Sequence, residues 1–600
     1  MLKALGWSSV LGETAALGQE TVTPSTTVRA AIHPAIGIAR VGNSSDEYFI
    51  GPELPWPTEA PEGGYKDAAG ALRRQAARFR IYGYDAEGRV TSELTAGNAS
   101  IRWTVHIANK KAAWYNFHVA LDLPTATPTL RRNAQFTGPQ RQGLIIDGGG
   151  RTISGPNESG PSYLFDTGRF LGRSVYLGEL RTDEKGRLLV LGGPGVAGPV
   201  THDRPAADFA NNEGWFDDIA DGSVTAEVLV DGQAIPVDPA WIVTCPPNYA
   251  PDLVSIQTMY DVVYDALQGN LLKPVTGVSF TEHIFPLLSQ MSESQWVNYG
   301  FHRRFGWGSQ YEFLKPDYLP QLASNDAAYL PVRREIFQNF RNPDFGSVET
   351  LAWPPIYGDA MDIPSSDPRQ FMAVTRTQYE YLRRWADGDF SSDLEGSVPA
   401  AATLDEVPLQ DRPGTLDKAA LYFCSGGPFH PGCEMTWPMR HRTMYASPFR
   451  LRHRSAAEAE PDYGHRVTMS DLTAALSASS PGDITRWMAV PWQTDAASCR
   501  AGYDPSFDPY LPAFWPARVP NHVLPMREYQ RVLDTSLSDA ERRDAFERRA
   551  EWYRWLAGDY IRQINQMVTD FGRMGVVQRR PGPDDGRFPA RMYVESDVSF

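Results

Sequence analysis

The sequence predicts an α+β protein, with a β-rich N-terminal part, a helical middle and a C-terminal part arranged around a shared core. Segments of alternating apolar and polar residues around Gly-containing turns dominate the first part of the chain. Amphipathic helical patterns with capping signals follow them. The chain has 600 residues, of which 42% are hydrophobic, so it is long and apolar enough to bury a large core.

Four regions are expected along the chain. Residues 1–27 read as a flexible N-terminal arm, and residues 28–250 as a mainly β region. Residues 251–395 read as a helical region, and residues 396–600 as a C-terminal α+β region that carries the sharpest motifs and the expected active site. The 51 glycines and 48 prolines favour many turns and short strands.

Three hairpins are predicted in the β region. The first is "RFRIYGYDAEGRVTSEL" (78–94), which alternates apolar and polar positions around an Asp-Ala-Glu-Gly turn. The second is residues 174–193, around "TDEKG", and the third is residues 223–237, around an Asp-Gly pair. No fixed-period repeat links them, so they are separate hairpins rather than units of a solenoid or propeller.

Three helices have clear patterns. Residues 259–267 are amphipathic. Residues 375–390 begin with a capping box and stop at a glycine. A third pattern begins with a capping box at Ser538 and continues to Gly575, which predicts one long helix.

Bulk composition excludes several classes of function. The net charge is −15 with a pI of about 5.3, and no basic run is sustained, so a nucleic-acid partner is disfavoured. No apolar run approaches the ~20 residues of a membrane span, and no signal peptide is recognisable, so a cytoplasmic location is expected. The four cysteines are too few for a disulfide framework. Nucleotide-binding, flavin-binding and hydrolase motifs are missing from the sequence.

The segment "CSGGPFHPGCEMTW" (424–437) presents His430 and Glu434 on a Gly/Pro-rich loop. A rigid loop of this kind suits a pocket wall, where histidine acts as an acid or base near neutral pH. A structural histidine at a turn is the alternative. A zinc site from Cys424, His430 and Cys433 matches no standard ligand spacing, so no metal is expected.

The segment "PWQTDAASC" (491–499) places Asp495 four residues before Cys499. A neighbouring carboxylate disfavours the thiolate, which argues against a papain-like nucleophile. An acid here suits proton acceptance during chemistry on a nearby ring, while an inert buried cysteine is the alternative. Tyr249, in "CPPNYAP" (245–251), reads either as a pocket-lining aromatic or as a plain turn residue.

Several long motifs together resemble those of the LodA/GoxA family, the lysine ε-oxidase and glycine oxidase type quinoproteins. They include "AIHPAIGIARVGNSSDEYFIGPELP" (31–55), "WTVHIANKKAAWYNF" (103–117), "DFANNEGWFDDIADGSVTAEV" (208–228) and "GGPFHPGCEMTW" (426–437). The resemblance implies oxidative deamination of an amino acid or related amine, with ammonia and hydrogen peroxide as products. It also implies a cysteine tryptophylquinone cofactor made from the enzyme's own Cys and Trp, a flavoprotein that assists maturation, and a homo-oligomer.

The resemblance assigns roles residue by residue. Cys499 resembles the sulfur half of the quinone, and Asp495 resembles the acid required to build it. His430 resembles the variable pocket position of the Gly-rich loop, with Glu434 beside it as a substrate-binding residue. Tyr249 resembles an aromatic that lines the substrate channel.

One position departs from the family pattern. The quinone tryptophan is expected late in the last long helix, where "DFGRMGVV" (570–577) places Phe571. A phenylalanine cannot become an indole quinone. On a continuous helix, Trp552 and Trp555 would lie roughly 24–29 Å from that position, which excludes them. Nothing in the spacing recommends Trp515, the other candidate.

Three functions follow from this sequence. The leading one is an amine-acting oxidoreductase of the resembled family. The second is a quinone-free biosynthetic enzyme on the same scaffold, which uses Cys499, Asp495 and His430 as acid/base, nucleophilic or metal-binding groups. The third is a non-catalytic relative that binds an amino acid or a partner protein.

Overall fold

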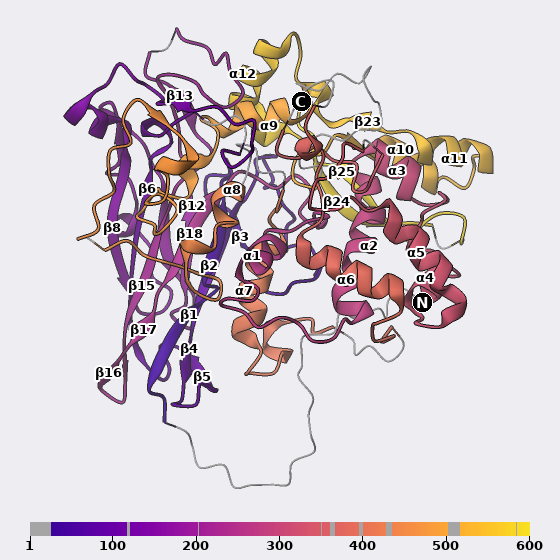
Figure 1. Ribbon diagram of the computed structural model, residues 1–600. Coiled ribbons are helices and arrows are strands. Elements are labelled where there is room, and N and C mark those ends of the chain that lie inside the picture. Colours follow the sequence, from indigo (N-terminus) through magenta and orange to yellow (C-terminus); the bar gives the residue numbers. More distant parts are fainter. Residues whose placement is uncertain are drawn as a thin grey trace.

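The computed structural model describes residues 26–116, 120–201, 203–349, 351–360, 366–394, 400–427, 435–455, 457–501, 517–583 and 585–600, without the side chains of 436 and 499–501. A large mixed sheet and a set of helices make up this part of the chain, so the α+β prediction is confirmed. Figure 1 shows the strands of the sheet, in indigo and purple, on the left. Helices α2–α6 lie on the right, and α9 and α12 lie near the top.

The large sheet has 13 strands. Its main path runs through β11 (Gly178–Thr182), β12 (Leu188–Gly192), β4 (Arg74–Tyr84), β2 (Ile36–Arg40), β18 (Ala240–Cys245), β15 (Asp221–Val230), β6 (Ser100–Asn109) and β8 (Ile146–Ser154). Five further strands join it: β1 (Arg29–His33), β3 (Tyr48–Ile50), β5 (Val90–Leu94), β16 (Gln233–Ile235) and β17 (Val237–Asp238). Strands β2 and β18 pair in parallel. This pairing brings the beginning and the end of the β region together, and the chain after Cys245 leads into the helical region.

The remaining strands of the described residues form short two-stranded ladders. They are β9 (Arg169–Phe170) with β10 (Arg173–Ser174), β13 (Ala197–Pro199) with β14 (Trp215–Asp217), β7 (Thr129–Leu130) with β21 (Arg466–Val467), β19 (Tyr445–Ser447) with β20 (Arg450–Leu451), β22 (His522–Val523) with β23 (Ala550–Glu551), and β24 (Val576–Pro581) with β25 (Arg591–Ser596).

All three predicted hairpins are confirmed. The pairs β4–β5, β11–β12 and β15–β16 are antiparallel. In the third, Asp231 and Gly232 have φ values of +50° and +77°, the left-handed conformations that a two-residue hairpin turn requires.

The described helices are α1 (Met259–Leu267), α2 (Phe285–Glu293), α3 (Tyr299–Phe305), α4 (Leu319–Ala323), α5 (Leu330–Asn339), α6 (Arg376–Asp387), α7 (Arg412–Tyr422), α8 (Thr436–Met439), α9 (Trp492–Ala501), α10 (Met526–Leu533), α11 (Asp539–Glu547) and α12 (Tyr560–Asp570). The predictions of α1 and α6 are confirmed. The Thr375 side chain accepts a hydrogen bond from Gln378 N at the start of α6, and Gly388 ends this helix at φ +86°.

The prediction of one long helix from Ser538 to Gly575 is wrong. Helix α11 begins at the Ser538 cap but ends at Glu547, and the chain then forms β23 and a short 3-10 helix, Trp552–Trp555. Gly558, at φ +92°, turns the chain, and the Asp559 side chain caps a new helix, α12. A glycine followed by an N-cap residue is a stop-and-start signal, and the apolar periodicity on both sides of it conceals the break.

The C-terminal elements share one buried cluster with the end of the β region. Residues of α9, α12 and β24 lie in this cluster together with Tyr249, which follows β18. The expected active-site region therefore lies where the sheet meets the C-terminal helices. None of the described helices is long and apolar enough to cross a bilayer.

Candidate active site

Helix α9 carries the Asp495–Cys499 pair, and a buried ion pair fixes its first residue. The Trp492 amide donates a hydrogen bond of 3.0 Å to Asp217 Oδ2. The same oxygen lies 2.7 Å from Lys111 Nζ, and both side chains are fully buried (0% exposed). Lys111 Nζ also donates to the Ala489 carbonyl at 2.8 Å. Two segments of the β region therefore determine where α9 begins.

A second buried carboxyl lies beside the first. Asp218 Oδ2 accepts hydrogen bonds from the amides of Gly195 and Val196 at 2.7 and 2.8 Å. Burial raises the pKa of the Asp218 carboxyl to about 7. The Gly195 carbonyl in turn accepts from Gln493 Nε2 of α9 at 2.8 Å, so this turn connects the sheet to the helix.

Asp495 is 1% exposed on α9, and Cys499 follows one helical turn later. Residues four apart lie on the same face of a helix, so the two positions share a face of α9. The Cys499 side chain lies outside the described part of the structure. What the fold establishes is a fully buried acid one turn from the cysteine position.

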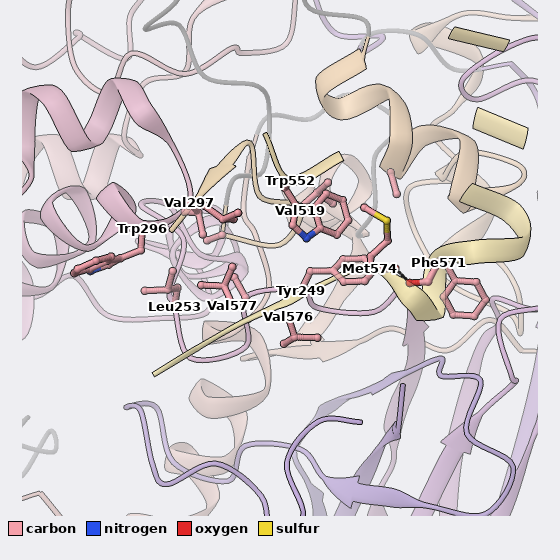
Figure 2. Close-up of a cluster of buried hydrophobic side chains, with 14 of the residues drawn as sticks. Tyr249, Leu253, Trp296, Val297, Val519, Trp552, Phe571, Met574, Val576 and Val577 are labelled. Carbon is pink, nitrogen blue, oxygen red and sulfur yellow. Dashed lines mark hydrogen bonds between the residues drawn. The ribbon is translucent and has the colours of Figure 1, made fainter. Parts of the chain in front are cut away.

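Two aromatic side chains pack beneath α9, as Figure 2 shows. The rings of Tyr249 and Trp552 lie 4.6 Å apart at an interplanar angle of 55°. Trp552 Nε1 donates a hydrogen bond of 2.8 Å to the Gly575 carbonyl, and Tyr249 Oη donates one of 3.0 Å to the Phe571 carbonyl. The indole is 1% exposed, so a hydrogen bond and a ring contact both hold it in place.

The segment that carries Trp552, a 3-10 helix, contacts the helix that carries Cys499. Trp552 shares the buried cluster with Ala496 and Ala497, which precede Cys499 on α9. Alanine is small enough to let a bulky ring approach the helix closely. The distance of 24–29 Å that excluded Trp552 assumed a continuous helix, and the chain between Trp552 and Phe571 does not form one.

Phe571 lies at the other end of α9. Its ring centroid is 5.3 Å from that of Trp492, the first residue of the helix. Cys499 follows seven residues later, about 10 Å further along the axis. Ser498, next to the cysteine, pairs its hydroxyl with that of Tyr560 at the start of α12 (3.0 Å). The two helices thus run antiparallel, with Phe571 at the level of Trp492.

The other sequence-derived positions are only partly described. His430, Glu434 and Trp515 lie outside the described residues. Trp555 is 37% exposed and stacks on Phe600, away from the buried cluster.

The loop that carries His430 begins at two closely packed glycines, Gly426 and Gly427. A Cβ at Gly426 would lie 2.1 Å from the Thr258 carbonyl oxygen, and one at Gly427 would lie 2.5 Å from Gln257 Oε1. At Gly426 the clash is with backbone, so only glycine fits at that position. The beginning of this loop is therefore packed against the N-terminus of α1.

No metal centre can be built from the described ranges, which hold no group of three or more His, Cys, Asp or Glu side chains suited to an ion. Two of the three zinc candidates, His430 and Cys433, lie outside those ranges.

Sequence reasoning did not find Lys111, Asp217 or the position of Trp552. The first two lie within the long motifs 103–117 and 208–228, but nothing in those motifs indicates that they pair with each other or hold the start of α9. The Gly558–Asp559 pair, a helix stop followed by an N-cap residue, was the sequence signal that could have predicted the position of Trp552.

Comparison with known proteins identifies the class. Residues 33–244 match the family described as L-Lysine epsilon oxidase N-terminal, and residues 357–515 match the L-lysine epsilon oxidase C-terminal domain. The L-lysine 6-oxidase of Marinomonas mediterranea is 30% identical over 545 residues, which cover 78% of this chain and 71% of that protein.

Solved structures agree with the sequence comparison. The crystal structure of the Schiff base intermediate of L-Lys epsilon-oxidase from Marinomonas mediterranea with L-Lys superposes with a TM-score of 0.68 at 26% identity, covering 95% of both chains. A second crystal structure of that enzyme gives a TM-score of 0.67 at 25% identity, covering 95% of this chain and 94% of the other.

The fold and the relatives define an oxidoreductase of the amino-acid oxidase class. The chain belongs to the L-lysine ε-oxidase (LodA-like) family, as the resemblance predicted, and the members of this family are quinoproteins.

Proposed function

We propose that this enzyme oxidatively deaminates an amino acid, using cysteine tryptophylquinone formed from Cys499 and Trp552. The overall reaction converts R–CH2–NH2, O2 and H2O into R–CHO, NH3 and H2O2. The observation that carries this proposal is the buried indole of Trp552, whose 3-10 helix contacts α9, the helix of Cys499. L-lysine is the first substrate to test, because the relatives are named for it.

The described residues fit the cofactor. A protein-derived quinone needs a tryptophan ring that is close to the cysteine and shielded from water. Trp552 is shielded from water, and the contact between its 3-10 helix and α9 supports the closeness to Cys499 that we propose. When formed, the quinone supplies an electrophilic carbonyl for the amine and accepts two electrons. Phe571 cannot provide the indole, and its ring lies at the opposite end of α9.

The surrounding side chains have distinct tasks in this proposal. Tyr249 packs on the Trp552 ring and keeps its orientation. Asp495 accepts protons as the ring loses hydrogens, since it is buried one turn before the cysteine. His430 and Glu434, on the Gly-rich loop, contribute to the substrate pocket, where an imidazole exchanges protons near neutral pH.

Maturation requires oxidation of the ring, and we propose that a flavoprotein partner assists it, as the family resemblance implies. We also propose that the mature enzyme is a homo-oligomer. Size-exclusion chromatography with light scattering tests the second point, since a single-chain mass would contradict it.

Peptide mass mapping of protein purified from its native host tests the proposed function. The expected result is a Cys499 peptide linked to the Trp552 peptide, with the mass of added oxygen, together with amino-acid-dependent release of peroxide. An unmodified Cys499 peptide without quinone absorbance would refute the oxidase and favour the quinone-free biosynthetic enzyme. A cross-link to another tryptophan would refute only the assignment of Trp552.

A further inference from the structure

A polar cavity of about 310 Å³ lies between α1, α6 and the segment that precedes α6. Its walls come from the C-terminal end of α1, the start of α6 and the segment between Gly358 and Val374. Gln257 and Met372 line it, and both also line a much smaller inner cavity whose wall includes Gly427 and Ala517. Ala517 belongs to the same buried cluster as Trp552. The two cavities adjoin each other at Gln257 and Met372.

The charges that line the larger cavity are mostly matched. Arg440 pairs with both Asp122 and Asp359, and Arg376 pairs with Asp344 on the rim. Arg440 thus faces two carboxylates, and Asp265, also in the lining, accepts hydrogen bonds from Thr377. None of these groups offers an unpaired cation to a ligand.

Arg369 differs from its neighbours. Its guanidinium makes no ion pair or side-chain hydrogen bond to another described residue, and it lies over the ring of Phe345 at 5.6 Å from the centroid. Phe345 has φ +51°, a left-handed conformation that is costly for a bulky residue. The chain thus adopts a strained backbone that places an aromatic ring under this arginine, and the ring orients the guanidinium while leaving its N–H donors available.

The backbone around Arg369 is also fixed. Its carbonyl accepts a hydrogen bond of 3.1 Å from Ala360 N, and a Cβ at Gly358 would lie 2.3 Å from the same oxygen. The Arg369 amide donates to Asp367 Oδ1 at 2.8 Å. A half-buried cation on a rigid segment, with five donors in a planar fork, is suited to bidentate recognition of a carboxylate.

We propose that Arg369 binds the carboxylate of the amino-acid substrate in this outer cavity, while the reacting amine extends past Gln257 and Met372 toward the inner cavity. The proposal rests on the proposed function and adds a specificity determinant to it. A substrate with a carboxylate is preferred over the amine of the same length that lacks it, because only the former matches the charge of Arg369.

Arg369→Gln tests the assignment, with Arg376→Gln as the matched control. Binding is measured by isothermal titration calorimetry on the mature protein under anaerobic conditions. The probes are the twenty protein amino acids, and the tightest binder is then compared with its decarboxylated amine. Arg369→Gln is expected to weaken binding of the amino acid by about 10- to 100-fold and to leave binding of the amine unchanged. Arg376→Gln is expected to change neither, because that exposed arginine already has a partner.

Three outcomes would overturn the proposal: no amino acid binds, Arg369→Gln weakens both probes equally, or Arg376→Gln has the same effect as Arg369→Gln. Arg369→Lys keeps the charge but loses the planar fork, and it is expected to recover binding only in part. The mass of the Cys499 peptide is recorded on the same preparations. A cross-linked peptide without Arg369-dependent binding refutes only this site, and an unmodified peptide with such binding refutes only the oxidase.

Discussion

Trp552→Phe tests whether the quinone forms on Trp552 rather than at the expected position, which Phe571 occupies. The substitution leaves an aromatic ring in the cluster but removes the indole, so the cross-link to Cys499 and the quinone absorbance are expected to disappear. Trp492→Phe is the matched control, since Trp492 is equally buried and belongs to α9 itself. The control is expected to keep the cross-link and the absorbance.

The structural cost of Trp552→Phe follows from its contacts. Losing the Nε1 hydrogen bond leaves the buried Gly575 carbonyl without this donor, which costs about 1–3 kcal/mol. The roughly 40 Å³ difference in side-chain volume, at about 24 cal/mol per Å³, adds about 1 kcal/mol. We therefore expect a loss of about 2–4 kcal/mol. Trp492 Nε1 has no hydrogen-bond partner in the described structure, so its substitution is expected to cost only the volume contribution, about 1 kcal/mol.

The assay has two readouts. Peptide mapping and absorbance report the quinone, and urea unfolding in a Cys499→Ala background, where no cross-link forms, reports the free energy. A cross-linked, absorbing Trp552→Phe protein would refute the assignment of the indole. Equal losses of stability in the two variants would refute the role of the hydrogen bond to Gly575.

Three further substitutions test the elements around α9. Lys111→Met leaves a buried carboxylate without its cation, and is expected to lower the free energy of unfolding by about 3–5 kcal/mol in urea titrations. Arg102→Met, which breaks an exposed pair, is expected to leave the free energy of unfolding almost unchanged because solvent screens that pair. Equal losses in the two variants would contradict the anchoring role of Lys111. Because the folded-state pKa of Asp218 is raised to about 7, its contribution to stability falls as pH rises from about 4 to 7. Asp218→Asn should therefore gain stability relative to the native protein between pH 5 and pH 8, and a constant difference in unfolding free energy would refute this. Gly195→Ala places a Cβ 2.3 Å from an aromatic ring at φ +84°, whereas Gly214→Ala at φ +77° meets no atom within 4 Å. Thermal unfolding is expected to show a loss of unfolding free energy of about 1 kcal/mol for Gly214→Ala and about 2–4 kcal/mol for Gly195→Ala. Equal losses would show that packing against that ring is unimportant.

Local patterns predicted much of this fold. The turns of the hairpins at residues 78–94, 174–193 and 223–237 and the capping box at Thr375 depend on residues within one or two turns of each other, so a short stretch of sequence contains all the information that they need. The long family motifs likewise identified the L-lysine ε-oxidase family, because they preserve residue order over most of the chain.

The candidate site was harder to predict from the sequence than the fold. The Asp495–Cys499 pair was visible because both residues lie on one helical turn. The position of Trp552 was not, because it depends on a chain reversal at Gly558 and on a contact with Tyr249, far away in sequence. Apolar periodicity predicts which face of a helix is buried. It does not show where the helix ends when the same apolar spacing continues beyond the break.

The sequence by itself determined the fold class, the family and one half of the candidate site, the acid and the cysteine position on α9. Only the tertiary structure decided that the segment of Trp552 contacts that helix, and which arginine of the outer cavity is left without a carboxylate among the described residues. The reason is physical: hydrogen bonds within a turn are set by adjacent residues, whereas burial and charge pairing are set by whatever the rest of the chain brings into contact.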